Sequence, residues 1–151
     1  MADLSTGRGM LYAEKIMISR QNQLAPMHRH IVKAEDIINR GGGRLVVELF
    51  MSDEEGGIDE EREVVVPVDG TIRKLPAGGH LALEAGESVT LIPGVWHAFW
   101  GEGGDVLVGE VSTVNDDLAD NVFRDSVGRF SKIEEDEPPS HLLVSDYDAW
   151  L

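Results

Sequence analysis

The chain has 151 residues, of which 42% are hydrophobic and 27% charged, the balance expected of one folded soluble domain. It has no cysteine, which excludes both disulfides and thiolate metal ligands. Thirteen basic and 28 acidic residues give a formal net charge of −15. Neither nucleic acid nor membrane is therefore expected as a partner, and a neutral ligand suits this charge better than a phosphorylated one.

Residues 1–10 are expected to form a lead before the domain. They lack both the positive charge and the apolar stretch of a signal peptide. No apolar run in the chain approaches the roughly 18 residues of a membrane-spanning helix. A cytoplasmic protein is therefore expected.

Residues 11–115 are predicted to form a barrel of short strands. β-Branched and aromatic residues recur in short runs that end at glycine or proline, which is typical of strands. The predicted strands are 12–18, 24–30, 44–51, 62–68, 71–75, 80–84, 88–93, 96–100 and 105–112. Hairpin turns are predicted at 69–70, 77–79, 85–87 and 101–104. This pattern predicts an all-β fold, either a sandwich or a single jelly-roll barrel.

Two polar stretches interrupt or follow this pattern. The acidic residues of 52–63 predict a solvated loop. Residues 116–151 show no clear period, and we expect them to form a C-terminal extension of the same domain that packs across the barrel.

The stretch PMHRHIVKAE at 26–35 places His28 and His30 one residue apart. On a strand both rings would point to one face and could converge on one ion, although two hydrogen-bonded histidines explain the spacing equally well. Glu35 breaks the period of two, so it needs a bend after His30 to reach the same ion. Alternatively, AEDIINR is a short helix with Glu35 in its first turn.

The stretch GESVTLIPGVWHAFW at 86–100 contains a proline-glycine turn followed by His97. A hairpin turn here would return His97 to the mouth of the barrel. Taken alone, His97 is as well explained as an ordinary half-buried histidine. The combination HxHxxxxE followed by PGxxH is more specific than either half.

This combination resembles the two motifs of cupins, which place three histidines and one glutamate around a divalent metal. The resemblance implies that His28, His30, Glu35 and His97 are the ligands and that the barrel is a cupin jelly roll. Such a nitrogen and oxygen donor set suits manganese, iron, cobalt, nickel or zinc. The resemblance favours one Mn²⁺ ion as the cofactor.

Several further stretches resemble the D-lyxose isomerase family over about residues 11–140. They are YAEKIMI, HRH, EDIINRGGG, PGVWHAFW, DVLVGEVSTVNDD and RFSKIEEDEPP, in this order. The resemblance implies a metal-dependent aldose–ketose isomerase that interconverts D-lyxose and D-xylulose, with D-mannose and D-fructose as secondary substrates. Many family members carry a longer, partly helical segment before the barrel, whereas about ten residues precede the first predicted strand here, so the family's oligomeric contacts are not carried over as an expectation.

Aldose–ketose isomerisation through an enediol moves a proton from C2 to C1, so a group that transfers the proton is needed. Glu110 in LVGEVS is the first candidate, expected across a hairpin from His97. Lys15 in AEKIM is the second, because a buried ammonium could hold an oxygen or pass a proton. Asp125 in VFRDSVG is the third. For each of the three, a solvent-facing charge is the alternative.

Two residues are candidates for binding the sugar itself. Glu48 in VVELF could bind sugar hydroxyls if it faces inward, although an outward glutamate is equally consistent. Alternation places Phe99 on the face of His97, where its ring could stack on a sugar or simply pack in the core.

Three other functions use related residues. A cupin dioxygenase would bind oxygen at the same metal and consume it during turnover. A sugar-binding module without turnover would keep the metal but would not need Glu110 or Lys15. A phosphosugar isomerase is disfavoured by the scarcity of basic residues. A homodimer is the expected assembly for each function.

Overall fold

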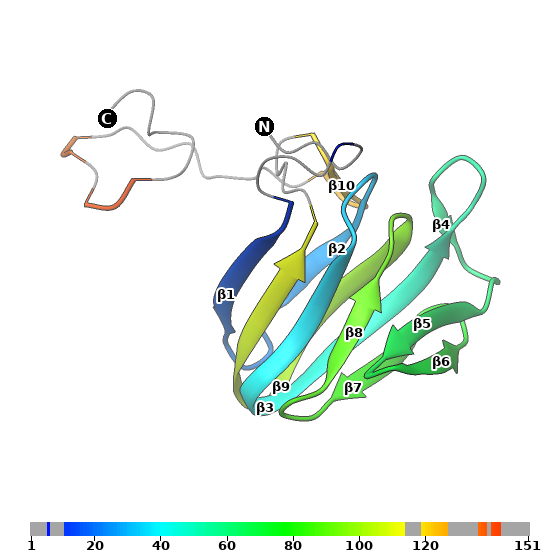
Figure 1. Ribbon diagram of the computed structural model, residues 1–151, viewed down its shortest axis with the longest axis horizontal. Coiled ribbons are helices and arrows are strands. Elements are labelled where there is room, and N and C mark those ends of the chain that lie inside the picture. The colour runs from blue at the N-terminus through cyan, green and yellow to red at the C-terminus, as the bar shows by residue number, and fades with distance from the viewer. Residues whose placement is uncertain (1–5, 7–10, 114–118, 127–135, 139, 143–151) are drawn as a thin grey trace.

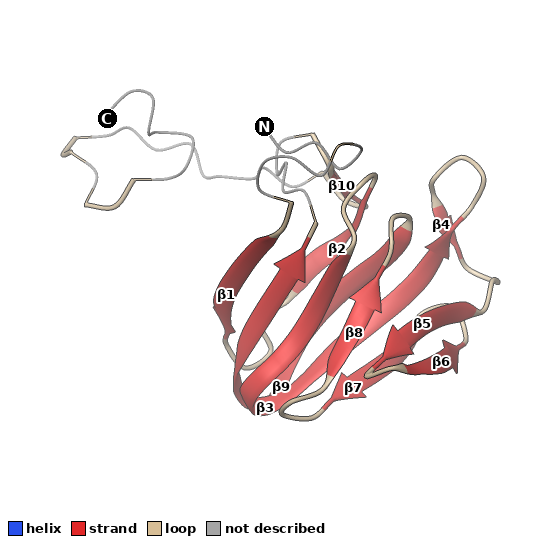
Figure 2. Cartoon of the chain, in the orientation of Figure 1, coloured by secondary structure: helices blue, strands red, loops and turns tan. Residues whose placement is uncertain are grey.

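The computed structural model describes residues 6, 11–113, 119–126, 136–138 and 140–142 (Figure 1). Every regular element within these residues is a β-strand, as Figure 2 shows, so the predicted all-β class is confirmed. No helix in this part of the chain is long and apolar enough to cross a membrane. Most of the predicted N-terminal lead and most of the predicted C-terminal extension lie outside the described residues.

The described residues form ten strands, which include all nine segments predicted as strands. They are β1 (Ala13–Ser19), β2 (Ala25–His30), β3 (Glu35–Ser52), β4 (Ile58–Asp59), β5 (Val64–Val68), β6 (Thr71–Leu75), β7 (Gly79–Leu83), β8 (Ser88–Leu91), β9 (Val95–Ser112) and β10 (Asn121–Phe123). The helix considered for AEDIINR is wrong, because these residues begin β3. The two segments predicted at 96–100 and 105–112 are parts of one strand, β9.

Two long strands, β3 and β9, organise the fold. They pair antiparallel along nearly their whole lengths, with Glu35 opposite Ser112 and Met51 opposite Val95. One half of this pair is flanked by β1 and β8, and β8 continues to β5 and β6. The other half is flanked by β2 and β7, and β2 continues to β10. The pair therefore passes from one sheet into the other, and the two sheets enclose the core as a jelly roll (Figure 1).

Glycines allow β3 and β9 to bend where they pass between the sheets. The register shifts on both sides of Gly41 and Gly42, which pair with Leu107 and Val106, close to the glycine-rich stretch 101–104 of β9. Gly42 has a φ of +101°, and a side chain there would collide with the carbonyl oxygen of Asp105. The side-chain amide of Asn39 donates to the carbonyl oxygens of Gly43 and Leu83, both at 2.9 Å, and braces the bend. The turn predicted at 101–104 is thus a bend within a strand and not a hairpin.

Alternating residues of the strands form one main core between the sheets. On β3 these are Leu45, Val47 and Leu49, and on β9 they include Val106 and Val108, all of them fully buried. Successive side chains of a strand point to opposite faces, so within a regular stretch every second residue shares the inward face of these core residues. The same alternation brings polar residues inward at the end of the barrel that lies away from the glycine bend.

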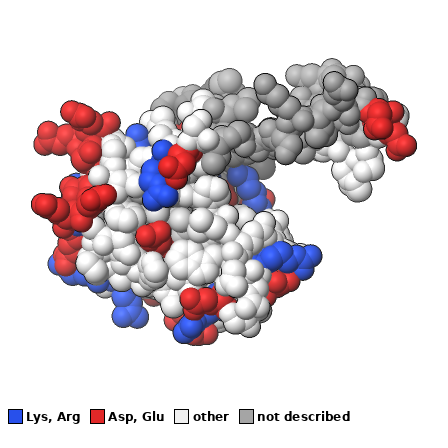
Figure 3. All heavy atoms as spheres, turned by 180° about the vertical axis from the view of Figure 1, so that it is seen from behind, with Lys and Arg blue, Asp and Glu red and all other residues white. Residues whose placement is uncertain are grey.

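The acidic stretch 52–63 is mostly exposed, as predicted, although β4 pairs with the end of β3. The Asp53 carboxylate accepts N–H bonds from Glu55 and Gly57 and closes the loop. Figure 3 shows acidic side chains projecting from the edge of the molecule that carries β4 in Figure 1.

Candidate metal centre

Strands β2 and β9 bring three histidines together. His28 lies directly opposite His97 in the antiparallel pair, and their ring centroids are 4.1 Å apart. The His28 and His30 centroids are 5.2 Å apart on the same strand. The turn at Pro93 and Gly94 precedes β9 but is not the predicted hairpin, because β8 and β9 both pair with β3. It carries the chain from one sheet to the other and so places His97 beside the histidines of β2.

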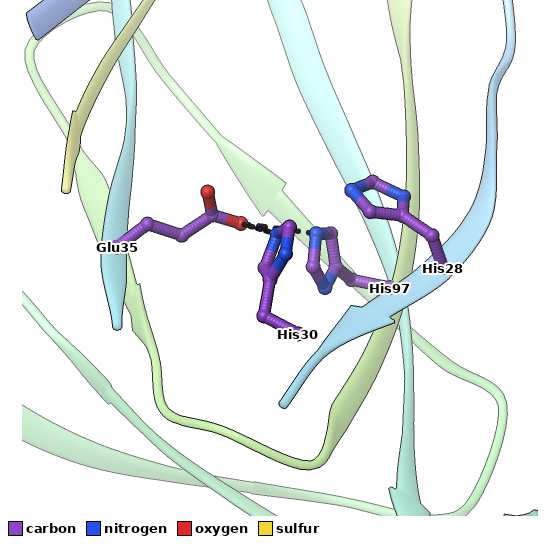
Figure 4. Close-up of side chains that lie close together, drawn as sticks. All are labelled: His28, His30, Glu35 and His97. Atoms are coloured by element: carbon purple, nitrogen blue, oxygen red, sulfur yellow. Dashed lines mark hydrogen bonds and ion pairs between the residues drawn. The ribbon is translucent and has the colours of Figure 1, made fainter. Parts of the chain in front are cut away.

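Glu35 faces the histidines from the first position of β3. Its Oε1 atom lies 3.2 Å from Nε2 of His30 and 3.1 Å from Nε2 of His97, as Figure 4 shows. Ligand atoms from His28, His30, Glu35 and His97 all lie within 4.8 Å of one another, so the cluster could hold a metal ion. The bend needed to return Glu35 to the histidines is supplied by residues 31–34.

The donor atoms of this cluster fit a divalent metal. Nδ1 of His28 lies 2.8 Å from the carbonyl oxygen of Pro26, and Nδ1 of His97 lies 3.1 Å from that of Val95. Donation from each Nδ1–H leaves the Nε2 lone pair directed at the cluster. Nε2 of His97 is buried and has no hydrogen-bond partner, because its contact with Glu35 lacks hydrogen-bond geometry. A cation between these atoms would satisfy it.

The protonation states of the cluster also suit a metal. Burial, together with the neighbouring His97, lowers the pKa of His28 to about 3, so this imidazole is neutral at neutral pH. Burial alone would raise the pKa of Glu35, but interactions with His30 and His97 outweigh it and hold the pKa below its usual range. Neutral imidazoles and ionised carboxylates are the forms that bind divalent metals.

A second group of charged side chains adjoins the cluster through Lys33. This lysine is only 4% exposed, and its Nζ lies 2.7 Å from Oε2 of Glu35 and 2.9 Å from Oε1 of Glu110. Burial lowers the pKa of Lys33, but the two carboxylates outweigh this effect and raise it overall. Lys15 lies opposite Glu110 in the β1–β9 pair, and its Nζ is 3.3 Å from the same Oε1 atom.

Asp120, which follows the barrel, holds the connection between β2 and β3 in place. Its buried carboxylate accepts the backbone N–H groups of Ile31, Val32 and Lys33 at 3.0, 2.7 and 2.9 Å. Its Oδ2 atom also lies 3.9 Å from Nδ1 of His30. Asp120 therefore positions both the buried lysine and the segment that returns Glu35 to the histidines.

The structure brings most of the predicted site residues to one end of the barrel, namely His28, His30, Glu35, His97, Lys15 and Glu110. Glu110 lies on the same strand as His97 and not across a hairpin from it, because β9 is continuous. Phe99 is on the His97 face as expected, but it is buried in the main core.

Two predicted residues lie away from this cluster. Glu48 pairs with Ala98, which belongs to a small cluster on the outer face of the sheet, whereas Val47 and Leu49 face the core. The inward orientation considered for Glu48 is therefore corrected, because alternation places it on the outer face. The Asp125 side chain is 73% exposed and pairs with its neighbour Arg124 at 3.0 Å, so it does not reach the histidines.

Three residues of the site were not predicted. Lys33 lies in the bend of residues 31–34 before β3, where the alternation of a strand does not apply, so no local spacing signalled its position. Asp120 and Phe123 come from a stretch without period, so their positions depend on tertiary packing alone. The Phe123 ring lies 5.5 Å from the His28 ring.

A model of the D-lyxose isomerase family matches residues 1–147. The chain belongs to the D-lyxose isomerase family. It is 55% identical over 138 residues to a D-lyxose/D-mannose isomerase of Serratia proteamaculans and 50% identical over 138 residues to one of Escherichia coli O157:H7. Each match covers 90% of this chain and 60% of the relative, so the chain spans only part of the length of these family members.

Solved structures share the fold of this D-lyxose isomerase family member. L-ribose isomerase of Cellulomonas parahominis, solved with L-ribose, matches with a TM-score of 0.52 and 23% identity over 74% of this chain and 57% of its own. A dTDP sugar isomerase of Desulfovibrio desulfuricans G20 matches with a TM-score of 0.56 and 14% identity over 83% of this chain and 72% of its own. These likenesses confirm the predicted single jelly-roll fold.

Proposed function

We propose that this chain is a metal-dependent aldose–ketose isomerase that interconverts D-lyxose with D-xylulose and D-mannose with D-fructose. The observation that carries the proposal is the contact of a three-histidine, one-glutamate cluster with a buried Lys33–Glu110 ion pair. Such a site combines donors for a metal with a carboxylate placed to transfer a proton. Membership of the D-lyxose isomerase family and the names of the two relatives support the choice of sugars.

His28, His30, Glu35 and His97 would hold one divalent ion. Their nitrogen and oxygen donors, together with the absence of cysteine, fit Mn²⁺, with iron, cobalt, nickel and zinc as competitors for the site. When bound, the ion supplies a Lewis acid that stabilises negative charge developing on O1 and O2 of an open-chain sugar.

Glu110 is proposed to carry the proton between C2 and C1. The ammonium groups of Lys15 and Lys33 both approach the same oxygen, Oε1, and we propose that the other oxygen, Oε2, faces the substrate. The two bonds hold the carboxylate in one orientation, which favours transfer of a proton along a defined line. Lys33 also contacts Glu35 and so keeps the proton-transfer group in a set position relative to the metal ligands.

The proposed assembly is a homodimer formed through the outer face of β1. Ile16 and Ile18 on β1 are 66% and 59% exposed, and Leu107, directly opposite Ile18, is 41% exposed. The charges beside this patch are paired within the chain, Arg40 with Glu14 and Arg20 with Asp105. Two copies of an acidic chain can approach each other where their surfaces are apolar and locally neutral, which supports this face as the contact.

The proposal is tested by incubating the Mn²⁺-loaded protein with free pentoses and hexoses in deuterated water, with oxygen uptake followed in parallel. Ketose should form from D-lyxose and D-mannose with deuterium at C1 or C2, and no oxygen should be consumed. Glu110→Gln should lower the rate of conversion by at least about 100-fold, whereas Glu63→Gln, on an exposed surface pair with Lys74, should match the wild type. Failure to convert any free sugar would remove the proposal, and oxygen uptake would favour a dioxygenase.

A further inference from the structure

Buried polar atoms without a partner gather at the candidate site. Within the described part of the chain, three buried side-chain atoms have no hydrogen-bond partner: Nε2 of His97, Nδ1 of His30 and Oγ of Ser112. A metal ion would be a partner for Nε2 of His97. Nδ1 of His30 has the Asp120 carboxylate as a neighbour, with Oδ2 at 3.9 Å. Neither explanation accounts for the hydroxyl of Ser112.

Ser112 lies next to one proposed metal ligand and on the same strand as the proposed proton-transfer group. It is the last residue of β9, is 3% exposed and stands directly opposite Glu35 on β3. Directly opposite residues on paired strands have Cβ atoms about 4.5–5.5 Å apart. Glu110 precedes Ser112 by two positions on the same strand, so both side chains share the inward face.

A second buried serine shows how this chain satisfies such a group elsewhere. Ser112 pairs with the first residue of β1, and Ser19 is the last residue of that strand. Ser19 is 7% exposed, and its hydroxyl donates to the carbonyl oxygen of Gln23 at 3.4 Å. Burying a hydroxyl without a partner is unfavourable, and such groups call for a specific explanation. The hydroxyl of Ser112 has no partner at the place where a polyhydroxylated substrate is proposed to bind.

We infer that Ser112 is a substrate-binding residue whose hydroxyl forms a hydrogen bond with a sugar hydroxyl at C3 or C4, beyond the two oxygens O1 and O2. The inference rests on the proposed function. A serine hydroxyl both donates and accepts, so it can pair with a sugar hydroxyl in either direction. A free, neutral monosaccharide carries a hydroxyl at C3, next to the reacting carbons C1 and C2, and another at C4.

The test uses Ser112→Ala, with Ser19→Ala as the matched control, and measures two properties of the Mn²⁺-loaded protein. The first is the Tm without sugar, which should be unchanged or higher in Ser112→Ala, because an unpaired hydroxyl is removed, and lower in Ser19→Ala. The second is calorimetric binding of the pentitol made by reducing D-lyxose, which cannot be isomerised. Ser112→Ala should weaken this binding about tenfold, as expected for one lost hydrogen bond, and Ser19→Ala should not.

Deoxy analogues of the pentitol locate the contact. Removing the hydroxyl that Ser112 binds should cost the wild type about tenfold in affinity and should cost Ser112→Ala nothing further. Ser112→Cys, which keeps the shape of the side chain with a somewhat larger atom and hydrogen-bonds weakly, should fall between the two proteins and serves if the alanine variant folds poorly.

The outcomes separate this inference from the proposed function. If Ser112→Ala lowers the Tm and binds every pentitol like the wild type, the hydroxyl is structural and the inference is wrong. If the wild type converts D-lyxose but the variant matches it in all measurements, only the inference fails. If the wild type neither binds the pentitol nor converts any sugar, both the inference and the proposed function fail.

Discussion

Replacing Lys33 with methionine removes the positive charge that joins the proposed metal ligand Glu35 to Glu110. Methionine keeps most of the length and apolar volume of lysine, so packing changes little and the effect is mainly electrostatic. The lysine is 4% exposed and contacts Glu35 at 2.7 Å and Glu110 at 2.9 Å, so two carboxylates with little access to water lose their nearest cation.

The size of the effect follows from the burial of these groups. Removing one partner of a buried ion pair costs about 3–5 kcal/mol, because the remaining charge is left uncompensated. Lys15 still contacts Glu110, so we expect the lower end, about 3 kcal/mol. For a protein of this size that loss lowers the Tm by about 6–12 °C. The loss should be smaller with Mn²⁺ bound, because the ion then faces Glu35.

The assay is thermal unfolding of the metal-free and Mn²⁺-loaded forms, with Lys74→Met as the control. Lys74 forms an exposed pair with Glu63 at 3.0 Å, and such pairs contribute about 0–1 kcal/mol, so this variant should stay close to the wild type. The double variant Lys33→Met/Glu110→Gln removes both charges and should recover part of the lost stability. A metal-free Lys33→Met protein with the Tm of the wild type, or a double variant that recovers nothing, would refute the reasoning.

Three further variants test other parts of the structure. Glu110→Gln should keep the bound metal and lower the Tm, because Lys33 then keeps only Glu35 as a partner, and below this Tm it should lower kcat for D-lyxose by at least about 100-fold; a variant with near-normal kcat would assign proton transfer to another group. Asp120→Ala removes the acceptor of three backbone N–H bonds and should cost about 3 kcal/mol in denaturant unfolding, whereas an unchanged midpoint would mean that the connection is held by other contacts. Ile16→Glu/Ile18→Glu should convert a dimer into monomers in light scattering after size-exclusion chromatography, and a persistent dimer would place the interface elsewhere.

The strands could be predicted because each carries a local signal. β-Branched and other apolar residues are concentrated in β1, β5 and the second half of β3, and the glycine and proline positions mark the turns. The first half of β3 was harder to assign, because AEDIINR suits a helix in isolation, and only pairing with β8 and β9 makes it a strand. Pairing across the barrel also turns the glycines of 101–104 into a bend in one strand.

The clustering of the three histidines could be predicted because spacing along the chain limits where their side chains point. His28 and His30 must share a face on any strand, and the turn before His97 limits where β9 can begin. The orientation of Glu48 depended on register, since a shift of one residue moves a side chain to the other face. Lys33 forms hydrogen bonds with Asp120 and with Glu110, which lie 87 and 77 residues away in the sequence. No local pattern encodes these contacts.

The central claim is that three histidines and one glutamate hold a single divalent ion. Its most direct test is metal analysis of the purified protein after saturation with Mn²⁺ and removal of free metal, with His97→Gln alongside. One equivalent of Mn²⁺ should remain on the wild type and almost none on the variant. A wild type that retains no metal, or a variant that retains a full equivalent, would contradict the assignment.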